Sequence, residues 1–193
     1  MDNQHAREKN DITVSFDSEE LILVDHNDNE IGHSSKDECH SGDGLLHRAF
    51  SLFIFNPIGE LLLQQRSAQK RLWPLYWSNT CCSHPRRGET VEQAVSRRLH
   101  EELGLASDLH FLYKFIYQAN YEDKGAEHEY CWVYTGKSAD TVRPNTNEVA
   151  GWRFVRPDSL DRELADRSPD FTPWLKMEWK RLRNDFKDRV AAL

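Results

Sequence analysis

The stretch NTCCSHPRRGE, from Asn79 to Glu89, places two adjacent cysteines and a histidine just before two arginines, a glycine and a glutamate. A Cys/His cluster of this kind can serve as a zinc-binding corner, a redox pair or a catalytic thiol. Adjacent cysteines lack the two-residue gap of ordinary zinc knuckles. The residue types alone leave these interpretations open.

A wider set of possible metal ligands is distributed along the chain. Imidazole and carboxylate groups together suit a divalent transition metal. Two carboxylates lie two residues apart in EHEYCW, and alternate residues of a strand face the same side, so both can point at one ion while His128 points away. Taken singly, each of the nine histidines is more often a surface or core residue. The set is His40, His47, His84, Glu127 and Glu129.

A helix is expected directly after this Cys/His stretch. Thr90 and Gln93 form a capping box at its start, and Gly104 is a suitable end. Arg98 and Glu102 lie one turn apart on it, beside a second glutamate, so carboxylates gather near its end. On composition alone such a cluster is more often a solvated polar face. The apolar residues at helical spacing are Val91, Ala94, Val95, Leu99 and Leu103.

The other elements are mostly strands, which gives an α/β (α+β) chain. Residues 21–32 read as a strand running into an Asn/Asp turn, and residues 49–66 as two strands joined by a Pro/Gly turn. Further strands are expected at about 110–118, 129–136 and 151–156. A C-terminal helix places Leu175, Trp179, Leu182 and Phe186 on one packing face.

Length and composition predict one domain of 193 residues that does not enter a membrane. Residues 1–19 are polar and aperiodic, so a flexible extension is expected there, followed by a single domain at 20–193. No apolar run reaches 18 residues and no signal peptide is recognised, which predicts a cytoplasmic protein without a membrane partner. The net charge of −7, without a long basic cluster, argues against a nucleic-acid partner. The oligomeric state is not predicted.

The chain has four cysteines, and a cytoplasmic protein is not expected to use them as a disulfide framework. They are Cys39, Cys81, Cys82 and Cys131.

The segment from Ser83 to Leu105 resembles the Nudix box, a glycine followed at fixed spacing by a glutamate and then by Arg-Glu-apolar-x-Glu-Glu-x-Gly-apolar. Two positions depart: Ser83 replaces the opening glycine and Arg98 the first glutamate of the Arg-Glu pair. Nudix hydrolases use the clustered carboxylates to hold Mg²⁺ on a diphosphate. Arg98 removes one ligand and adds a charge suited to phosphate. The matching residues are Glu89, Arg97, Leu99, Glu101, Glu102, Gly104 and Leu105.

From about Leu21 to Trp179, the order and spacing of these motifs resemble the type I isopentenyl-diphosphate Δ-isomerases. The resemblance implies a Nudix-like fold, with a mixed β-sheet core flanked by helices. It also implies the conversion of isopentenyl diphosphate to dimethylallyl diphosphate in isoprenoid biosynthesis. In that reaction a proton is added at one carbon and another is removed elsewhere, through a tertiary carbocation.

The resemblance also implies roles for individual residues. Cys82 and Glu129 match the catalytic thiol and carboxylate, Tyr117 a tyrosine that hydrogen-bonds to that carboxylate, and Trp174 a tryptophan that faces the carbocation. The five possible ligands above match a divalent metal site for Mn²⁺ or Zn²⁺, in which the ion holds Glu129. Glu102 and the Cys82 carbonyl match the groups that place the Mg²⁺ of the diphosphate. Basic positions for the diphosphate correspond to Lys36, Arg66, Lys70 and Arg98.

Two other functions compete with isomerisation. A Nudix hydrolase of a nucleotide or another diphosphate would share the fold and the Mg²⁺, although Arg98 and the Cys82/His84 motif argue against it. A non-catalytic metal-binding or thiol-sensing module would be built on Cys81, Cys82, His84 and Cys131.

Overall fold

The computed structural model describes residues 12–166 and 168–192. None of the helices in these two ranges combines the length and the apolar character needed to cross a bilayer. The strands are β1 (Glu20–Val24), β2 (Glu30–Ser35), β3 (His47–Phe55), β4 (Leu61–Arg66), β5 (Trp77–Ser78), β6 (Cys81–Ser83), β7 (His110–Tyr121), β8 (Gly125–Lys137) and β9 (Val149–Val155). The helices are α1 (Lys36–Cys39), α2 (Val91–Leu103), α3 (Pro157–Asp166), α4 (Pro173–Asp185) and α5 (Lys187–Ala191), with a 3-10 turn at Ser168–Asp170.

The strands form one mixed sheet in which β3 occupies a central position. It pairs in parallel with β8 along its whole length, from His47 opposite Glu129 to Phe55 opposite Lys137. It also pairs antiparallel with β6, where Ser51 lies opposite Cys82. Segments that are remote in the sequence therefore meet on either side of one strand.

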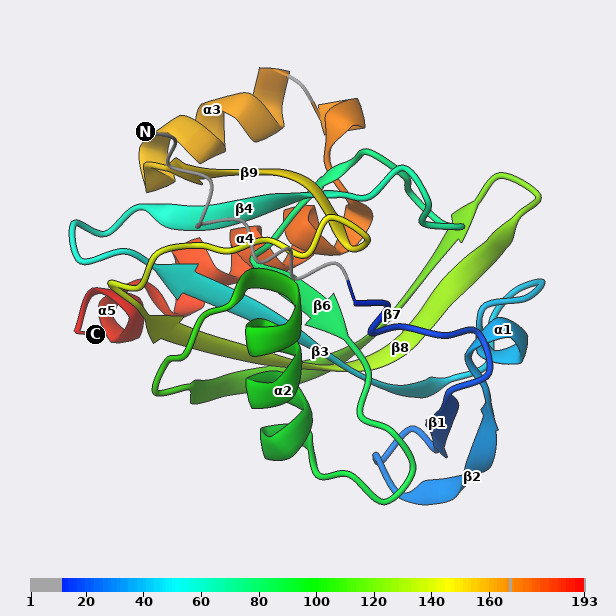
Figure 1. Cartoon of the computed structure of the whole chain (residues 1–193). Helices are drawn as coiled ribbons and strands as arrows, with labels where there is room; N and C mark the ends of the chain where they lie inside the picture. The colour runs from blue at the N-terminus through cyan, green and yellow to red at the C-terminus, as the bar shows by residue number, and fades with distance from the viewer. Residues whose placement is uncertain (1–11, 167, 193) are drawn as a thin grey trace, which may run out of the picture.

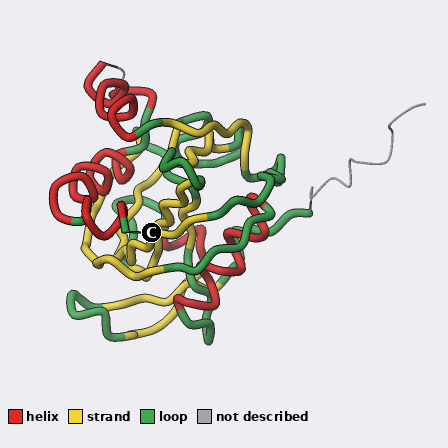
Figure 2. The backbone as a smooth tube through the Cα atoms, turned by 90° about the vertical axis from the view of Figure 1, so that its left-hand side faces the viewer, coloured by secondary structure: helices red, strands yellow, loops and turns green. Residues whose placement is uncertain are grey.

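Helices cover the two faces of the sheet, with α2 on one face and α3 and α4 on the other (Figures 1 and 2). Strand β3 supplies both cores because alternate side chains point to opposite faces. Phe53 and Phe55 pack with α3 and α4, whereas Phe50, Leu52 and Ile54 pack with α2. This sandwich confirms the predicted fold class.

Helix α2 follows the sequence prediction closely. The capping box is present, since Thr90 Oγ1 accepts from the backbone N–H of Gln93 and the Gln93 side chain accepts from that of Thr90. Gly104 adopts the left-handed conformation at the C-cap, with φ of 66°, which favours glycine. The predicted C-terminal helix is also present as α4, although it ends before Phe186.

The chain preceding β1 lies against the domain from Ile12 onward. Asn145 Nδ2 donates to the Ile12 carbonyl at 2.8 Å, and Arg98 Nη1 donates to the Val14 carbonyl at 2.8 Å. The ammonium of Lys36 donates to Ser15 Oγ. Residues 12–19 therefore pack against the domain, whose start is predicted at residue 20. Residues 1–11 of the predicted extension lie outside the described ranges.

We expect Gly125→Ala to destabilise the fold more than an alanine at an ordinary turn glycine. Gly125 has φ of +139°, and a Cβ there would lie 2.1 Å from the His40 carbonyl oxygen. The strained conformation and the clash together should lower the free energy of unfolding by about 2–4 kcal/mol, as measured by denaturant unfolding.

Gly59→Ala is the matched control, because Gly59 has φ of +81° but no atom within 4 Å of the added Cβ. It should cost only about 1 kcal/mol. Equal losses for the two variants would contradict the close packing inferred around His40.

Candidate active site

A cavity of about 230 Å³ collects most of the predicted functional residues. Two other predicted residues, His47 and Glu102, do not line the cavity. Both are buried, with 0% and 3% of their surface exposed. The predicted residues that line it are Lys36, His40, Arg66, Lys70, Cys82, His84, Arg98, Tyr117, Glu127, Glu129 and Trp174.

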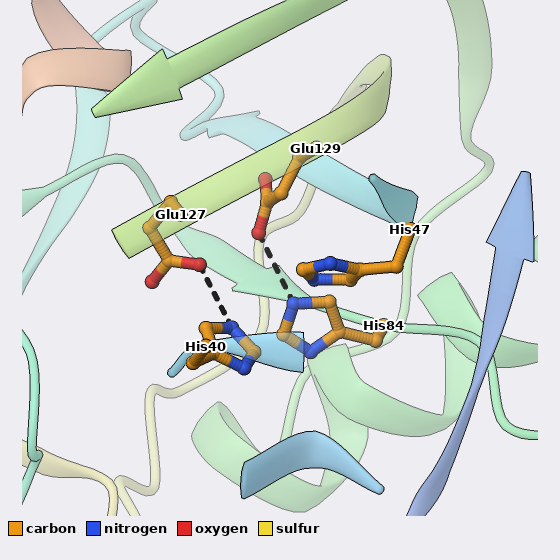
Figure 3. Close-up of side chains that lie close together, drawn as sticks. All are labelled: His40, His47, His84, Glu127 and Glu129. Carbon is orange, nitrogen blue, oxygen red and sulfur yellow. Dashed lines mark hydrogen bonds and ion pairs between the residues drawn. The ribbon is translucent and has the colours of Figure 1, made fainter. Parts of the chain in front are cut away.

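The five predicted metal ligands form one cluster (Figure 3). Their ligand atoms all lie within 4.8 Å of one another, and the three imidazole rings have centroids 4.8 to 5.1 Å apart. His40 follows α1, His47 begins β3 and His84 follows β6. Glu127 and Glu129 project from the same face of β8, whereas His128 turns away to Gly44, as predicted.

The hydrogen bonds of two histidines leave nitrogen lone pairs for a ligand. His47 Nδ1 lies 2.7 Å from the Leu45 carbonyl, and His40 Nδ1 lies 2.7 Å from the Lys36 carbonyl. Because a carbonyl only accepts, both Nδ1 atoms must carry hydrogen. Within the described residues, the buried Nε2 of His47 has no hydrogen-bond partner. This nitrogen therefore carries a lone pair that faces the cluster.

Two contacts between imidazole and carboxylate in the cluster need a proton or a metal ion to be favourable. His40 Nε2 lies 2.8 Å from Glu127 Oε2, and His84 Nε2 lies 3.1 Å from Glu129 Oε1. Either a proton or a metal ion must lie between each pair of atoms, since two lone pairs repel. Nitrogen and oxygen donors in this arrangement suit a divalent transition metal, so the residues fit the predicted metal.

Burial controls the protonation of the cluster. It lowers the pKa of His47 to about 3, and with the neighbouring His47 it lowers that of His84 well below the ordinary range. Burial would raise the pKa of Glu127, but the adjoining His40 lowers it. Burial and the charge of Glu127 raise the pKa of Glu129. His47 and His84 are therefore neutral at physiological pH, the form that binds metal.

The Cys82 thiol lies in a polar niche of the cavity wall. It donates to Asn79 Oδ1 at 2.7 Å and accepts from Trp174 Nε1 at 3.0 Å. Two hydroxyl oxygens are farther away, those of Ser78 at 3.5 Å and Ser51 at 3.8 Å. Burial raises the pKa of Cys82 to about 12, so the group is a thiol at neutral pH.

The adjacent cysteine faces the other side of the sheet. Cys81 is fully buried and packs with α2 in the opposite core. The alternation of a strand thus separates the doublet into one thiol in the cavity and one outside it. All four cysteines are free in the structure.

Tyr117 and Trp174 also line the cavity. The Tyr117 hydroxyl donates to Glu129 Oε2 at 2.7 Å, the hydrogen bond implied by the family resemblance. The guanidinium carbon of Arg66 lies 5.2 Å from the centroid of the Trp174 ring, which shows that a cation can approach the indole face.

Positive charges also line the cavity. Lys36 has its pKa lowered to about 8 by burial and by the charge of Lys70. Lys70 pairs with Glu148, whose carboxylate also lies 3.3 Å from Arg98 Nη2. Arg66 donates to backbone carbonyls of the loop before β5, which fix its guanidinium at the wall.

Arg98 and Glu102 form a buried ion pair. Arg98 Nη2 lies 2.6 Å from Glu102 Oε1, and Gln64 Nε2 donates to Glu102 Oε2 at 3.2 Å. The carboxylate of Glu102 thus lies behind Arg98, and its predicted role in placing Mg²⁺ stays a prediction.

Sequence reasoning missed two groups at the cavity. Glu148 holds Lys70 and Arg98, but it lies in a loop with no periodicity or motif to indicate it. Thr13, Ser15 and Asp17 also line the cavity, although the sequence predicts only a flexible extension at residues 1–19. Only the tertiary fold brings these residues to the site.

The sequence is similar to a described family and to named enzymes. The NUDIX domain family matches residues 45–175. The Isopentenyl-diphosphate Delta-isomerase 1 of Photorhabdus laumondii is 40% identical over 175 residues, which are 90% of this chain and 99% of the relative. The Isopentenyl-diphosphate Delta-isomerase of Burkholderia multivorans is 45% identical over 156 residues, 81% of this chain and 88% of the relative.

Solved structures agree on the fold. Protein DR0079 of Deinococcus radiodurans superposes with a TM-score of 0.63 at 25% identity, covering 77% of this chain and 90% of the other. A MutT protein of Methanosarcina mazei superposes with a TM-score of 0.62 at 17% identity, covering 74% and 96%. At that identity the second comparison supports the fold alone.

We expect the purified protein to bind one divalent transition metal at the cluster. His47→Ala removes a lone pair that has no other partner, so metal affinity should fall by about 100-fold or more, as measured by competitive chelation and elemental analysis. Protons compete for the imidazoles, so metal is also lost as the pH falls.

His128→Ala is the matched control, because His128 lies on β8 between two of the ligands but points away from the cluster. It should retain the metal of the unmodified protein. Metal loss that is equal in the two variants would argue against a site at the cluster.

Proposed function

Because the chain belongs to the NUDIX family and, within it, to the isopentenyl-diphosphate Delta-isomerases, we propose that this cavity converts isopentenyl diphosphate to dimethylallyl diphosphate. The enzyme is an isomerase of isoprenoid biosynthesis. The observation that supports the location is that Cys82 and Glu129 line one cavity together with Tyr117 and Trp174.

The reaction needs two proton-transfer groups and no net change in charge. One group gives a proton to a carbon of the double bond, and another removes a proton from the neighbouring carbon of the resulting cation. An unactivated alkene is a weak base, so this requires a positioned acid and a site with little water. We assign the two roles to Cys82 and Glu129, on opposite sides of the five-carbon unit, and reversal of the reaction exchanges them.

The surroundings of each group suit its role. Cys82 is a thiol at neutral pH and has the Trp174 N–H, at 3.0 Å, to stabilise the sulfur when it loses its proton. The Tyr117 hydroxyl, at 2.7 Å, orients one oxygen of Glu129. The Trp174 ring would face the carbocation, where a cation–π contact contributes about 2 kcal/mol in a desolvated site.

The histidine cluster would hold Mn²⁺ or Zn²⁺ through His40, His47, His84, Glu127 and Glu129. When bound, such an ion supplies positive charge that favours the ionised form of Glu129. Burial and the charge of Glu127 raise the pKa of this carboxyl, so a bound ion would determine whether Glu129 can accept a proton.

The basic residues of the cavity would bind the diphosphate. Lys36, Arg66, Lys70 and Arg98 all line it, and ionic hydrogen bonds to phosphate are strong. The Mg²⁺ carried by the diphosphate would be placed by Glu102 and the Cys82 carbonyl. Glu102 already contacts Arg98 at 2.6 Å, so the ion would share this carboxylate with the guanidinium.

An isotope experiment separates isomerisation from hydrolysis. With isopentenyl diphosphate in D₂O and Mg²⁺, we expect deuterium in the dimethylallyl diphosphate formed, observed by NMR, because each turnover exchanges a proton with the enzyme. Release of phosphate without isomerisation would contradict the proposal and favour a Nudix hydrolase, which a panel of nucleoside diphosphate derivatives tests directly.

Substitutions test the two assigned groups. Cys82→Ala and Glu129→Gln should each lower kcat by about 10³-fold or more while the fold survives, because each removes a proton-transfer group. Cys81→Ala should keep most of the activity, since Cys81 faces the other side of the sheet. An inactive Cys81→Ala beside an active Cys82→Ala would reverse the assignment of the thiol.

A further inference from the structure

Two bulky residues in the loop between β4 and β5 have a strained backbone. Trp73 has φ of 46° and Leu75 has φ of 63°, in the left-handed region that residues with a Cβ rarely adopt. Leu75 is exposed, whereas Trp73 is 4% exposed and belongs to the same apolar core as Trp174. Strain of this kind persists only where surrounding contacts enforce it, so the contacts of Trp73 indicate what it does.

The guanidinium of Arg66 holds the backbone at Trp73. Its Nη2 atom donates to the Leu72 carbonyl at 2.8 Å, and its Nε atom donates to the Trp73 carbonyl at 3.0 Å. Because the φ angle of Trp73 determines how the preceding peptide is oriented, the two bonds together depend on the strained conformation. They use one edge of the guanidinium, which leaves the Nη1 end for the diphosphate that Arg66 is proposed to bind.

The Trp73 side chain contacts the tryptophan proposed to face the carbocation. The rings of Trp73 and Trp174 have centroids 5.2 Å apart and an interplanar angle of 88°, a perpendicular arrangement that aromatic rings favour. Arg66 completes a group of three, since its guanidinium carbon lies 5.2 Å from the Trp174 ring centroid. The ring of Tyr121, at the end of β7, also contacts Trp73, with 4.9 Å between centroids.

The hydrogen bonds of Trp174 fix one edge of its indole. Nε1 donates to Ser78 Oγ and to Cys82 Sγ, both at 3.0 Å. Bonds at a single nitrogen leave the ring able to tilt about that edge, yet a cation is stabilised best when it lies over the ring face. The Trp73 ring, packed at 88° against the indole, opposes this tilt.

We propose that Trp73 is a positioning residue for Trp174: it holds the indole at the angle at which the ring face meets the carbocation, and Arg66 in turn holds Trp73. The inference rests on the proposed function and on the proposed role of Trp174 in it. Trp73 does not line the cavity, so it acts on the reaction through its neighbour and does not touch the substrate. One guanidinium thus serves both the diphosphate and the ring that stabilises the cation.

Two substitutions at Trp73 separate positioning from packing. Trp73→Phe keeps an aromatic ring against Trp174, so we expect kcat for isopentenyl diphosphate within about threefold of the unmodified protein. Trp73→Leu keeps an apolar side chain but removes the ring, so the indole can tilt and kcat should fall about 10-fold or more. The inhibition constant of inorganic pyrophosphate should change less than about threefold in both variants, because the carbonyls that hold Arg66 belong to the backbone.

Trp132→Leu is the matched control, because Trp132 lies on β8 and packs with the opposite core. It should leave kcat unchanged. The double variant Trp73→Leu/Trp174→Leu should be no slower than Trp174→Leu alone, since Trp73 acts through Trp174. Trp73→Met, whose flexible side chain also lacks a ring, keeps the test decisive if the leucine variant does not fold.

Three results would overturn the inference: equal losses of kcat in the phenylalanine and leucine variants, losses that multiply in the double variant, or weaker pyrophosphate binding without a change in kcat. A fully active Trp73→Leu beside an impaired Trp174→Leu would refute this inference alone. A fully active Trp174→Leu would refute the proposed role of Trp174 and this inference with it.

Discussion

The site depends on the position of β3 between β6 and β8. The parallel register with β8 places His47 opposite Glu129, and the antiparallel register with β6 places Ser51 opposite Cys82. Because side chains alternate along a strand, a one-residue slip in either pairing would turn the affected groups to the other face. The two apolar cores that β3 joins therefore hold the proposed metal ligands and the proposed catalytic thiol in fixed relation.

That rigidity makes the electrostatics of the cavity possible. Three imidazoles and two carboxylates are buried together, an arrangement that is unfavourable unless positive charge compensates it. Burial keeps His47 and His84 neutral, so their lone pairs are available, and it also keeps Cys82 in the thiol form. The same lack of water that makes these groups costly to bury would protect a carbocation from capture.

The sequence predicted local elements and motif residues well because their signals are themselves local. The capping box of α2, the common facing of Glu127 and Glu129, and the gathering of the five possible metal ligands all appear in the structure. Glu148 was not predicted, because it lies in an irregular loop. Its contacts with Lys70 and Arg98 come from neighbours that only the folded chain supplies.

Arg98 shows how one substitution can redirect a shared fold. In the Nudix box its position holds a glutamate, and the arginine here pairs instead with Glu102 and approaches Glu148. Position 98 therefore carries a cation where the Nudix box has a carboxylate. This change weakens the binding of several Mg²⁺ ions and favours direct binding of the phosphate groups. Cleavage of a diphosphate bond depends on clustered metal ions. In isomerisation the diphosphate does not react and serves only to bind the substrate. The proposed reactive groups, Cys82 and Glu129, can then lie elsewhere in the cavity, beside Tyr117 and Trp174.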